Sequence, residues 1–324
     1  MKYYIGIDLG GTNIVAGIVN EQFELIAKAS EKTNAGRPAQ EIAKTMADTA
    51  KAAVHAAGLE LSQITSAGIG TPGIVDNEKR EVIFASNLYF HNVPLGQMVE
   101  DELHIPVFVA NDADTAAYGE FMAGAGKMED GHHISNMLAI TLGTGVGSGI
   151  IINSKIYNGY GFAGGEFGHT VIHLGGRQCA CGRKGCLETY CSATGLITTT
   201  KEHMRRNPDS LMWKLCGGDI DKVDGRTSFD AAAQGDAAGK AVVEEYTSAL
   251  GESIVNAINT LQPEIVCIGG GVSKQGENLL RPIRTYMDSY CFDRFAKNRT
   301  EIRIAQLGND AGVIGAALIG LQQD

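Results

Sequence analysis

Three cysteines crowd into one short segment of the chain, together with two glycines. The thiols belong to Cys179, Cys181 and Cys186. Thiolates are soft ligands and glycine lets the backbone curl tightly, so the pattern indicates one tetrahedral zinc ion. The spacing leaves His169, His173 and Cys191 open as the fourth ligand. A fourth protein ligand would close the coordination sphere, which predicts a structural zinc; a disulfide between two of the cysteines is the alternative.

Two glycine-threonine turns form the second group of residues that could bind a ligand. The first contains Gly10, Gly11, Thr12 and Asn13, and the second contains Gly143, Thr144 and Gly145. Glycine lets backbone N–H groups approach an anion, and threonine adds a hydroxyl. Each turn alone is also compatible with an ordinary hairpin, but the two together predict a binding site that contacts a polyphosphate from both sides. Asp8, before the first turn, could hold Mg²⁺ through water, because Mg²⁺ keeps much of its hydration shell.

Asp112 is the candidate for a catalytic base. It follows a short apolar segment, Val107 to Ala110, and stands beside Asn111. A carboxylate at the end of a strand would project into a cleft, where it could accept a hydroxyl proton. The alternative is a helix N-cap, because Asn and Asp commonly precede helices. For Asp114 we favour this capping interpretation.

The composition narrows the class of protein. A formal net charge of -10 argues against a broad binding surface for nucleic acid or anionic lipid. The N-terminus has no leader pattern, and no apolar run reaches the length of about 18 residues that a membrane span needs. We therefore expect a cytoplasmic protein without a membrane partner. In a reducing compartment, clustered thiols favour metal binding over disulfides.

The chain repeats one pattern, in which three short strands precede a helix and an apolar strand that ends in glycine. The first copy is predicted at Tyr3 to Asp8, Ile14 to Val19, Glu24 to Ala29, Pro38 to Ala57 and Thr65 to Gly70. The second is predicted at Met137 to Leu142, Gly147 to Ile152, Lys155 to Tyr157, Asp236 to Leu261 and Ile265 to Ile268, and it closes on Gly269, Gly270 and Gly271. Two such copies predict two α/β lobes of similar topology with ligands bound between them.

The expected boundary between the lobes lies near Tyr118. The first lobe then spans residues 1–117, and the second, with the zinc loop, spans 118–308. A final helical pattern within 309–324 could return to the first lobe. The segment Gly68 to Gly73 fits the dinucleotide pattern G-x-G-x-x-G, but no helix pattern follows it, so a Rossmann-type site is not expected.

In this order, the motifs resemble those of the ROK family of sugar kinases, and most of all its bacterial glucokinases. The resemblance covers essentially the whole chain. Its segments are Ile5 to Thr12, Gly70 to Gly73, Asn111 to Asp114, Gly165 to His169, and the cysteine segment through Glu188. It implies an actin-like fold, a duplicated ribonuclease H-like ATPase with an inserted zinc loop, whose domains close over sugar and ATP.

The resemblance also implies roles for the matching residues, with Asp112 as the general base. The sugar would contact Gly73, Asn87, Asn111, Asp112, Glu166, His169 and Glu188. The nucleotide would contact Asp8, Gly10 to Asn13, Gly143 to Gly145, and Gly269 to Gly271. His169 would complete the zinc site, because one ring nitrogen can bind metal while the other forms a hydrogen bond. Asp114 departs from the family pattern, in which many relatives have Asn.

We therefore expect an ATP-dependent hexose kinase that phosphorylates the 6-hydroxyl of glucose with Mg²⁺ and holds a structural Zn²⁺. The family suggests a homodimer or a homotetramer. A kinase for mannose, fructose or an N-acetylhexosamine is the first alternative, since these sugars differ by single groups. A sugar-sensing regulator is the second; such relatives carry an additional N-terminal helix-turn-helix, for which the position of Asp8 leaves no room. An ATPase of the same fold would not need the zinc loop.

Overall fold

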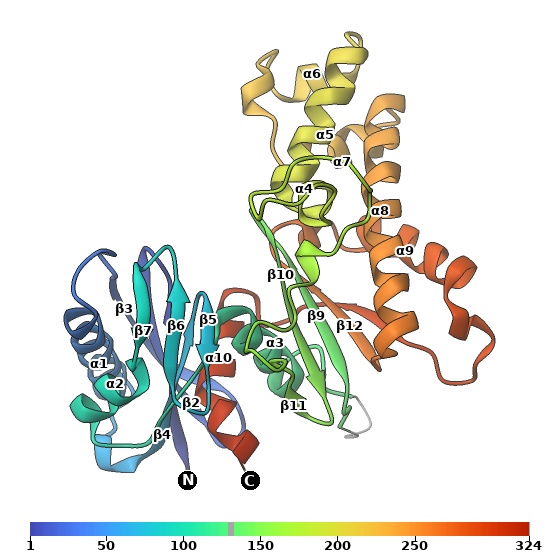
Figure 1. Cartoon of the computed structure of the whole chain (residues 1–324). Coiled ribbons are helices and arrows are strands. Elements are labelled where there is room, and N and C mark those ends of the chain that lie inside the picture. Colours follow the sequence, from blue (N-terminus) through green and yellow to red (C-terminus); the bar gives the residue numbers. More distant parts are fainter. Residues whose placement is uncertain (129–132, 324) are drawn as a thin grey trace. The chain divides into compact units, whose positions relative to one another are not determined.

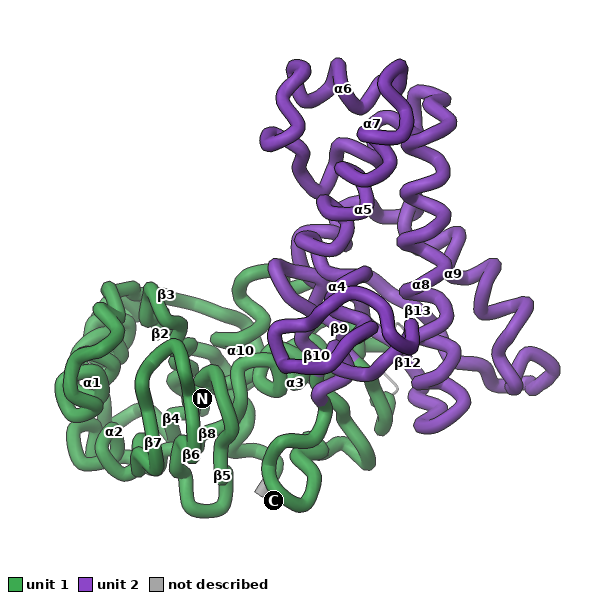
Figure 2. Tube along the Cα trace, turned by 45° about the horizontal axis from the view of Figure 1, so that its top comes forward, with its two compact units in different colours: residues 1–138, 149–165, 306–324 green, residues 139–148, 166–305 purple. Residues whose placement is uncertain are grey.

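A computed structural model of the protein describes residues 1–128 and 133–323, so Asp324 of the expected C-terminal segment lies outside it. The chain divides into two compact units, coloured separately in Figure 2. Unit 1 comprises Met1–Leu138, Gly149–Gly165 and Gln306–Asp324, and unit 2 comprises Ala139–Ser148 and Glu166–Ala305. The expected boundary at Tyr118 falls inside a helix, Asp112–Ala123, that belongs wholly to unit 1 because it packs against the C-terminal helix there.

The elements of unit 1 come from both ends of the chain. They are β1 (Tyr3–Leu9), β2 (Asn13–Asn20), β3 (Leu25–Lys32), α1 (Ala39–Ala56), β4 (Ile64–Thr71), β5 (Ile74–Asp76), β6 (Glu81–Ala85), β7 (Phe90–Val93), α2 (Leu95–Leu103), β8 (Val107–Asn111), α3 (Asp112–Ala123), β11 (Lys155–Ile156) and α10 (Ala311–Leu318). The division between the units falls within β9 (Met137–Leu142) and β10 (Val146–Ile152).

Unit 2 is richer in helix. Its elements are α4 (Glu188–Cys191), α5 (Ala193–Arg206), α6 (Leu211–Leu215), α7 (Thr227–Ala233), α8 (Ala237–Leu261), β12 (Ile265–Gly269), α9 (Glu277–Tyr290) and β13 (Glu301–Ile304). No helix among residues 1–128 and 133–323 combines the length and the apolar character that a membrane span requires.

The two large sheets have the same order of strands. The first runs β3-β2-β1-β4-β8 and the second runs β11-β10-β9-β12-β13. Each therefore places its three-stranded meander beside the strand that follows a long helix. The duplicated α/β fold predicted from the sequence is confirmed. A third, smaller sheet, β5-β6-β7, was not predicted, because its strands are too short to give a clear periodic pattern.

Helices cover both faces of the first sheet (Figure 1). Alternate residues of a strand point to opposite faces. In β1, Ile5 and Ile7 are fully buried in a core that also contains Ile42 and Met46 of α1. The residue between them, Gly6, faces α10 instead. The apolar positions of α1 recur at helical spacing, so one face of α1 packs against the side of the sheet that carries Ile5 and Ile7. Helix α10 covers the opposite side, which carries Gly6.

A row of three glycines brings the backbone of α10 close to the sheet. Gly6 of β1 pairs in register with Gly17 of β2 and with Gly68 of β4. A Cβ atom on Gly6 would overlap the carbonyl oxygen of Val313, and one on Gly68 would overlap that of Ala316. Because these contacts are with helix backbone, no side-chain rearrangement could relieve them. The glycines are therefore required for the docking of α10.

The first prediction concerns this contact. Gly68→Ala should lower the free energy of unfolding by about 2 kcal/mol or more, because an added methyl group overpacks the rigid contact between β4 and α10. Gly161→Ala is the control in the same unit, since a Cβ atom there meets nothing within 4 Å. Urea unfolding of both variants would measure the difference. Equal stabilities would contradict the role assigned to the glycine row.

Candidate active site and metal centre

Asn111 connects two parts of the candidate sugar site in unit 1. It ends β8 and caps α3, where its Oδ1 accepts a hydrogen bond from the Ala113 N–H at 2.8 Å. Its Nδ2 donates to the carbonyl oxygen of Gly73 at 2.9 Å. Gly73 has a φ of +99°, and a Cβ atom there would overlap Phe84 O, so this turn requires glycine. The structure thus brings Gly73 and Asn111 together at the start of α3.

Asp112 is the first residue of α3, directly after the cap. Its Oδ1 accepts a hydrogen bond from the Ala113 N–H at 2.9 Å. Burial raises the pKa of the Asp112 carboxyl, which makes it a stronger base once it is ionised. Asp114 is buried inside the first turn, and Asn111 holds the capping position, so the capping interpretation of Asp114 was wrong.

The negative charge of Asp112 acts on the carboxyl of Asp8. Asp8 lies in β1 on the face that carries α10, and a Cβ atom on Gly312 would lie 3.3 Å from its Oδ2. Burial first, and then the negative charge of Asp112, raise the pKa of the Asp8 carboxyl to about 6. Asp8 is half-buried and Asp112 is exposed, and a divalent cation near them would offset the effect of the Asp112 charge on Asp8.

The first glycine turn follows β1 and is held by its own strands. The Gly10 N–H donates to the Asn13 carbonyl at 2.9 Å, and the Thr33 hydroxyl donates to the Gly10 carbonyl at 2.6 Å. A Cβ atom on Gly11 would lie 3.5 Å from Nδ2 of Asn87, which comes from the segment between β6 and β7. The small sheet therefore brings Asn87 next to the predicted phosphate turn.

The second glycine turn, in unit 2, connects β9 to β10. The Gly143 N–H donates to the Gly145 carbonyl at 3.0 Å. Oε2 of Glu188 accepts a hydrogen bond from the Val146 N–H at 3.1 Å. Gly270 lies against the end of β9 with a φ of +85°, and a Cβ atom on it would overlap the Leu142 backbone. The turn from Gly269 to Gly271 and the carboxylate of Glu188 thus both adjoin the second predicted phosphate turn.

The predicted zinc ligands converge in unit 2. The ligand atoms of His169, Cys179, Cys181 and Cys186 all lie within 4.8 Å of one another. His169 Nδ1 is 3.7 Å from Cys179 Sγ, and Cys181 Sγ is 3.6 Å from Cys186 Sγ. Ligands at about 2.1 to 2.3 Å from one tetrahedral zinc ion lie about 3.4 to 3.8 Å apart. The cluster therefore fits a zinc ion with four protein ligands.

The geometry distinguishes the three candidates for the fourth ligand. The ring of His173 packs edge-on against Tyr190 with centroids 4.6 Å apart, and Cys191 is buried in α4, so neither belongs to the cluster. The seven cysteines are free thiols, so the alternative disulfide is not formed. Of the three candidates, only His169 is placed to complete the cluster.

The zinc cluster adjoins the predicted sugar-binding residues of unit 2. Cys179 Sγ lies 3.8 Å from Oε1 of Glu188, and His169 Nε2 lies 3.9 Å from Oε2 of Glu166. A zinc ion would fix the backbone on which His169 and Glu188 stand, because a closed site cross-links segments that are distant in sequence. The structure thus brings Glu166, His169 and Glu188 around the metal centre.

Two threonines were missed by the sequence analysis. Thr33 donates to the carbonyl of Gly10, as described above, and Thr194 Oγ1 donates to the carbonyl of Thr144 at 2.9 Å. Each hydroxyl holds one of the two glycine turns. Neither residue belongs to a recognisable motif, since threonine is frequent in strands and near helix starts. Only the fold reveals these contacts.

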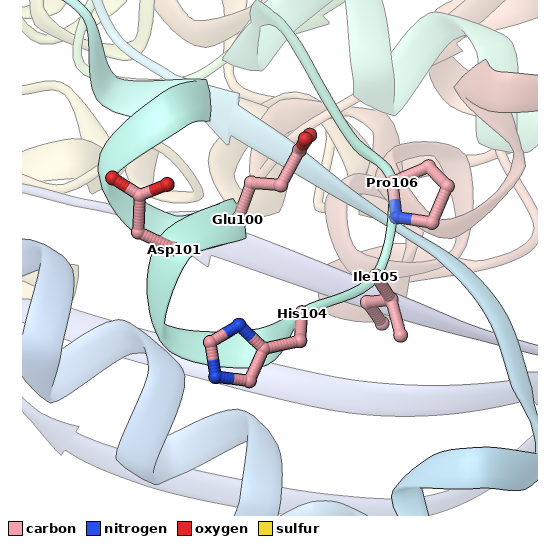
Figure 3. A pocket seen from close by; sticks show the side chains of 5 residues that line it. All are labelled: Glu100, Asp101, His104, Ile105 and Pro106. Atoms are coloured by element: carbon pink, nitrogen blue, oxygen red, sulfur yellow. The ribbon is translucent and has the colours of Figure 1, made fainter.

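A pocket of about 340 Å³ lies outside these residues (Figure 3). It is lined by Glu100, Asp101, His104, Ile105 and Pro106, from the end of α2 and the segment that leads into β8. Glu100 is already engaged there, since it forms an ion pair with Arg80. None of the predicted site residues lines this pocket, so it has no part in the proposed chemistry.

Comparison with known proteins places these motifs in a family. Residues 4–323 match the model of the ROK family. The chain belongs to the ROK family. It is 39% identical to a glucokinase of Halalkalibacterium halodurans, a match that covers 100% of this chain and 96% of that protein. It is 30% identical to a xylose repressor of Caldicellulosiruptor bescii over 96% of this chain and 76% of the repressor.

A solved structure of the same family resembles the chain over its whole length. It is a ROK family glucokinase from Streptomyces griseus in complex with glucose and AMPPNP. The identity is 33%, the TM-score is 0.76, and the match covers 99% of each chain. A ROK hexokinase from Thermus thermophilus matches with 27% identity and a TM-score of 0.77. The sugar kinase fold of the family is therefore the fold of this chain.

The second prediction concerns the charge of Asp8. Folding raises the pKa of Asp8, so the folded protein favours the protonated carboxyl. The stability that this protonated carboxyl contributes relative to the ionised one is therefore lost as the pH rises from about 4 to about 6. Asp8→Asn should therefore stabilise the ligand-free protein at pH 7.5, by up to about 3 kcal/mol at about 1.4 kcal/mol per pKa unit. The gain should vanish near pH 4.

Urea unfolding at the two pH values measures this effect. Asp48→Asn, on the exposed face of α1, is the control and should change stability little at either pH. A destabilised Asp8→Asn protein at pH 7.5 would contradict the cost assigned to the partly buried Asp8 carboxylate and its repulsion by Asp112.

The third prediction concerns the metal. The purified protein should contain a single zinc ion per chain, and Cys181→Ser should lose most of it because one of four ligands is removed. Cys216→Ser is the matched control, since Cys216 is a buried thiol outside the cluster. Mass spectrometry of the metal content after gel filtration would measure both. Zinc retained at the wild-type level in Cys181→Ser would exclude this cluster as the binding site.

Proposed function

We propose that the protein transfers the γ-phosphoryl group of ATP to the 6-hydroxyl of glucose. The observation that carries this proposal is the likeness, over 99% of both chains, to a glucokinase that binds glucose and AMPPNP. The 39% identity to a second glucokinase supports the same activity. Such a reaction needs a base, a binding site for the phosphates and side chains that bind the sugar. Asp112, the two glycine-rich turns and the residues around the zinc cluster are our candidates for these parts.

Asp112 acts in this proposal as the general base. Its carboxylate accepts the proton of the 6-hydroxyl while that oxygen attacks the γ-phosphorus in line. Phosphoryl transfer passes through a loose transition state, so positioning and charge neutralisation contribute most of the catalysis. Mg²⁺, when bound, would neutralise charge on the phosphate oxygens near Asp8. The raised pKa of Asp112 favours proton acceptance late in the reaction.

The remaining site residues hold the two substrates. For the sugar we propose Gly73, Asn87, Asn111, Glu166, His169 and Glu188. For the nucleotide we propose Asp8, Gly10 to Asn13, Gly143 to Gly145, and Gly269 to Gly271. The hydrogen bond between Asn111 and Gly73 and the contacts of Glu188 with the second turn support these assignments. We also propose a cytoplasmic homodimer or homotetramer, which light scattering would test.

A sugar-sensing regulator is the alternative from a different functional class. It is favoured by the 30% identity to a xylose repressor, of which the chain matches 76%. Within the kinase class, another hexose could replace glucose, because sugars that differ by one hydroxyl or acetamido group are separated by small energies. Turnover, and its dependence on the sugar, separates these possibilities.

The experiment that tests the proposal is ADP release with Mg-ATP against a panel of sugars. The panel contains glucose, mannose, fructose, N-acetylglucosamine, N-acetylmannosamine and a control without sugar. Glucose should give the highest kcat/KM, and the reaction without sugar should be negligible. Release of ADP that does not depend on sugar would indicate an ATPase. Sugar binding without any turnover would favour the regulator.

The fourth prediction concerns the base. Asp112→Asn should lower kcat at least ~100-fold, because the carboxylate that accepts the proton is replaced by an amide. Glucose binding, measured by calorimetry, should largely survive, since an amide has a similar size and can form hydrogen bonds. Asp114→Asn is the control two residues away and should keep near wild-type turnover. Normal turnover in Asp112→Asn would show that another group takes the proton.

A further inference from the structure

Two neighbouring carbonyl groups of the second glycine turn are held by the start of α5. The Ala193 N–H donates to the Gly143 carbonyl at 2.8 Å, and Thr194 Oγ1 donates to the Thr144 carbonyl at 2.9 Å. Ser192, the N-cap of α5, accepts a hydrogen bond from the Gly195 N–H at 2.9 Å and fixes the helix start. Successive peptide groups of the turn are thus anchored to successive residues of one helix.

These anchors also determine where the N–H groups of the turn point. In a trans peptide the carbonyl and the following N–H point in opposite directions, and no cis peptide occurs in the described part of the chain. Holding the carbonyls of Gly143 and Thr144 against α5 therefore directs the N–H groups of Thr144 and Gly145 away from α5. Within residues 1–128 and 133–323, no acceptor is found for either N–H. Two adjacent free N–H groups form an anion-binding nest.

A threonine hydroxyl also holds a carbonyl of the first glycine turn, one position earlier in that turn. The Thr33 hydroxyl donates to the Gly10 carbonyl at 2.6 Å, which directs the Gly11 N–H away from Thr33. Thr33 is fully buried, so this hydroxyl serves the turn rather than solvent. In each copy of the repeat, a threonine from a neighbouring segment holds a carbonyl of the turn. A threonine hydroxyl therefore restrains the backbone of each turn.

We propose that Thr194 is a positioning residue for nucleotide binding. Its hydroxyl fixes the peptide between Thr144 and Gly145, so that the Gly145 N–H is available to a phosphate oxygen of the nucleotide. Without this hydrogen bond the peptide can rotate, because glycine on its C-terminal side tolerates most backbone angles. The Thr194 hydroxyl acts through the turn, because it donates its hydrogen bond to the Thr144 carbonyl. This inference rests on the proposed kinase function.

The test is a comparison of Thr194→Val, Thr194→Ser and Thr198→Val in the full-length protein. Valine keeps the shape of threonine but removes the hydroxyl, and serine keeps the hydroxyl. Thr198 is the matched control, since it is an exposed threonine one turn later in α5 whose hydroxyl donates to the Thr194 carbonyl, within the helix. The measurements are kcat, the KM values for ATP and glucose, and the Kd for ADP by calorimetry.

Thr194→Val should raise the KM for ATP and the Kd for ADP about 3- to 10-fold, the equivalent of losing one net hydrogen bond. The KM for glucose should stay near wild type. Thr194→Ser should restore nucleotide affinity, and Thr198→Val should not change it. Unchanged ATP affinity in Thr194→Val, failure of serine to restore it, or an equal loss in Thr198→Val would overturn the role of Thr194.

The outcome for the wild-type protein keeps the two proposals apart. A wild-type protein that turns over glucose, together with an unaffected Thr194→Val variant, contradicts only the positioning role. A wild-type protein that neither binds ADP nor turns over glucose contradicts the kinase function on which that role rests.

Discussion

The close approach of α10 to the glycine row of the first sheet is the constraint on which unit 1 depends. Gly6, Gly17 and Gly68 lie side by side on β1, β2 and β4; Gly6 and Gly68 leave room for the backbone of α10, and Gly17 leaves room for the side chains of Leu25 and Val313. The same approach partly buries Asp8 beside Gly312, and burial in turn raises the pKa of its carboxyl. The packing that brings the C-terminal segment onto the sheet thus also creates the electrostatic environment of the predicted metal-phosphate site.

In unit 2 one short segment carries several parts of the site. Cys186 belongs to the cluster that fits zinc, Glu188 accepts a hydrogen bond from Val146, directly after the second glycine turn, and Thr194 donates one to a carbonyl of that turn. A displacement of the cluster would therefore shift both Glu188, which we propose binds the sugar, and the second glycine turn. This explains why a kinase whose chemistry needs no zinc would retain a closed metal site.

The sequence was sufficient for the parts of the site that lie in continuous motifs. The cysteine cluster, both glycine turns and the repeat could be predicted, because each depends on local spacing or periodicity. The choice of His169 over His173 rested on the family resemblance alone, since spacing does not tell which ring turns toward the thiols. Asp114 was misread because capping propensity alone does not rank it against Asn111. The contact of Thr194 depends on how α5 lies against the turn.

The proposed reaction requires the 6-hydroxyl of glucose as the phosphoryl acceptor. The most direct measurement is NMR of the product formed from ¹³C-labelled glucose and Mg-ATP by the zinc-loaded protein. We expect a single phosphorylated product in which phosphorus couples to carbon 6. A product with phosphate on carbon 1, or release of inorganic phosphate with no phosphorylated sugar, would contradict transfer to the 6-hydroxyl.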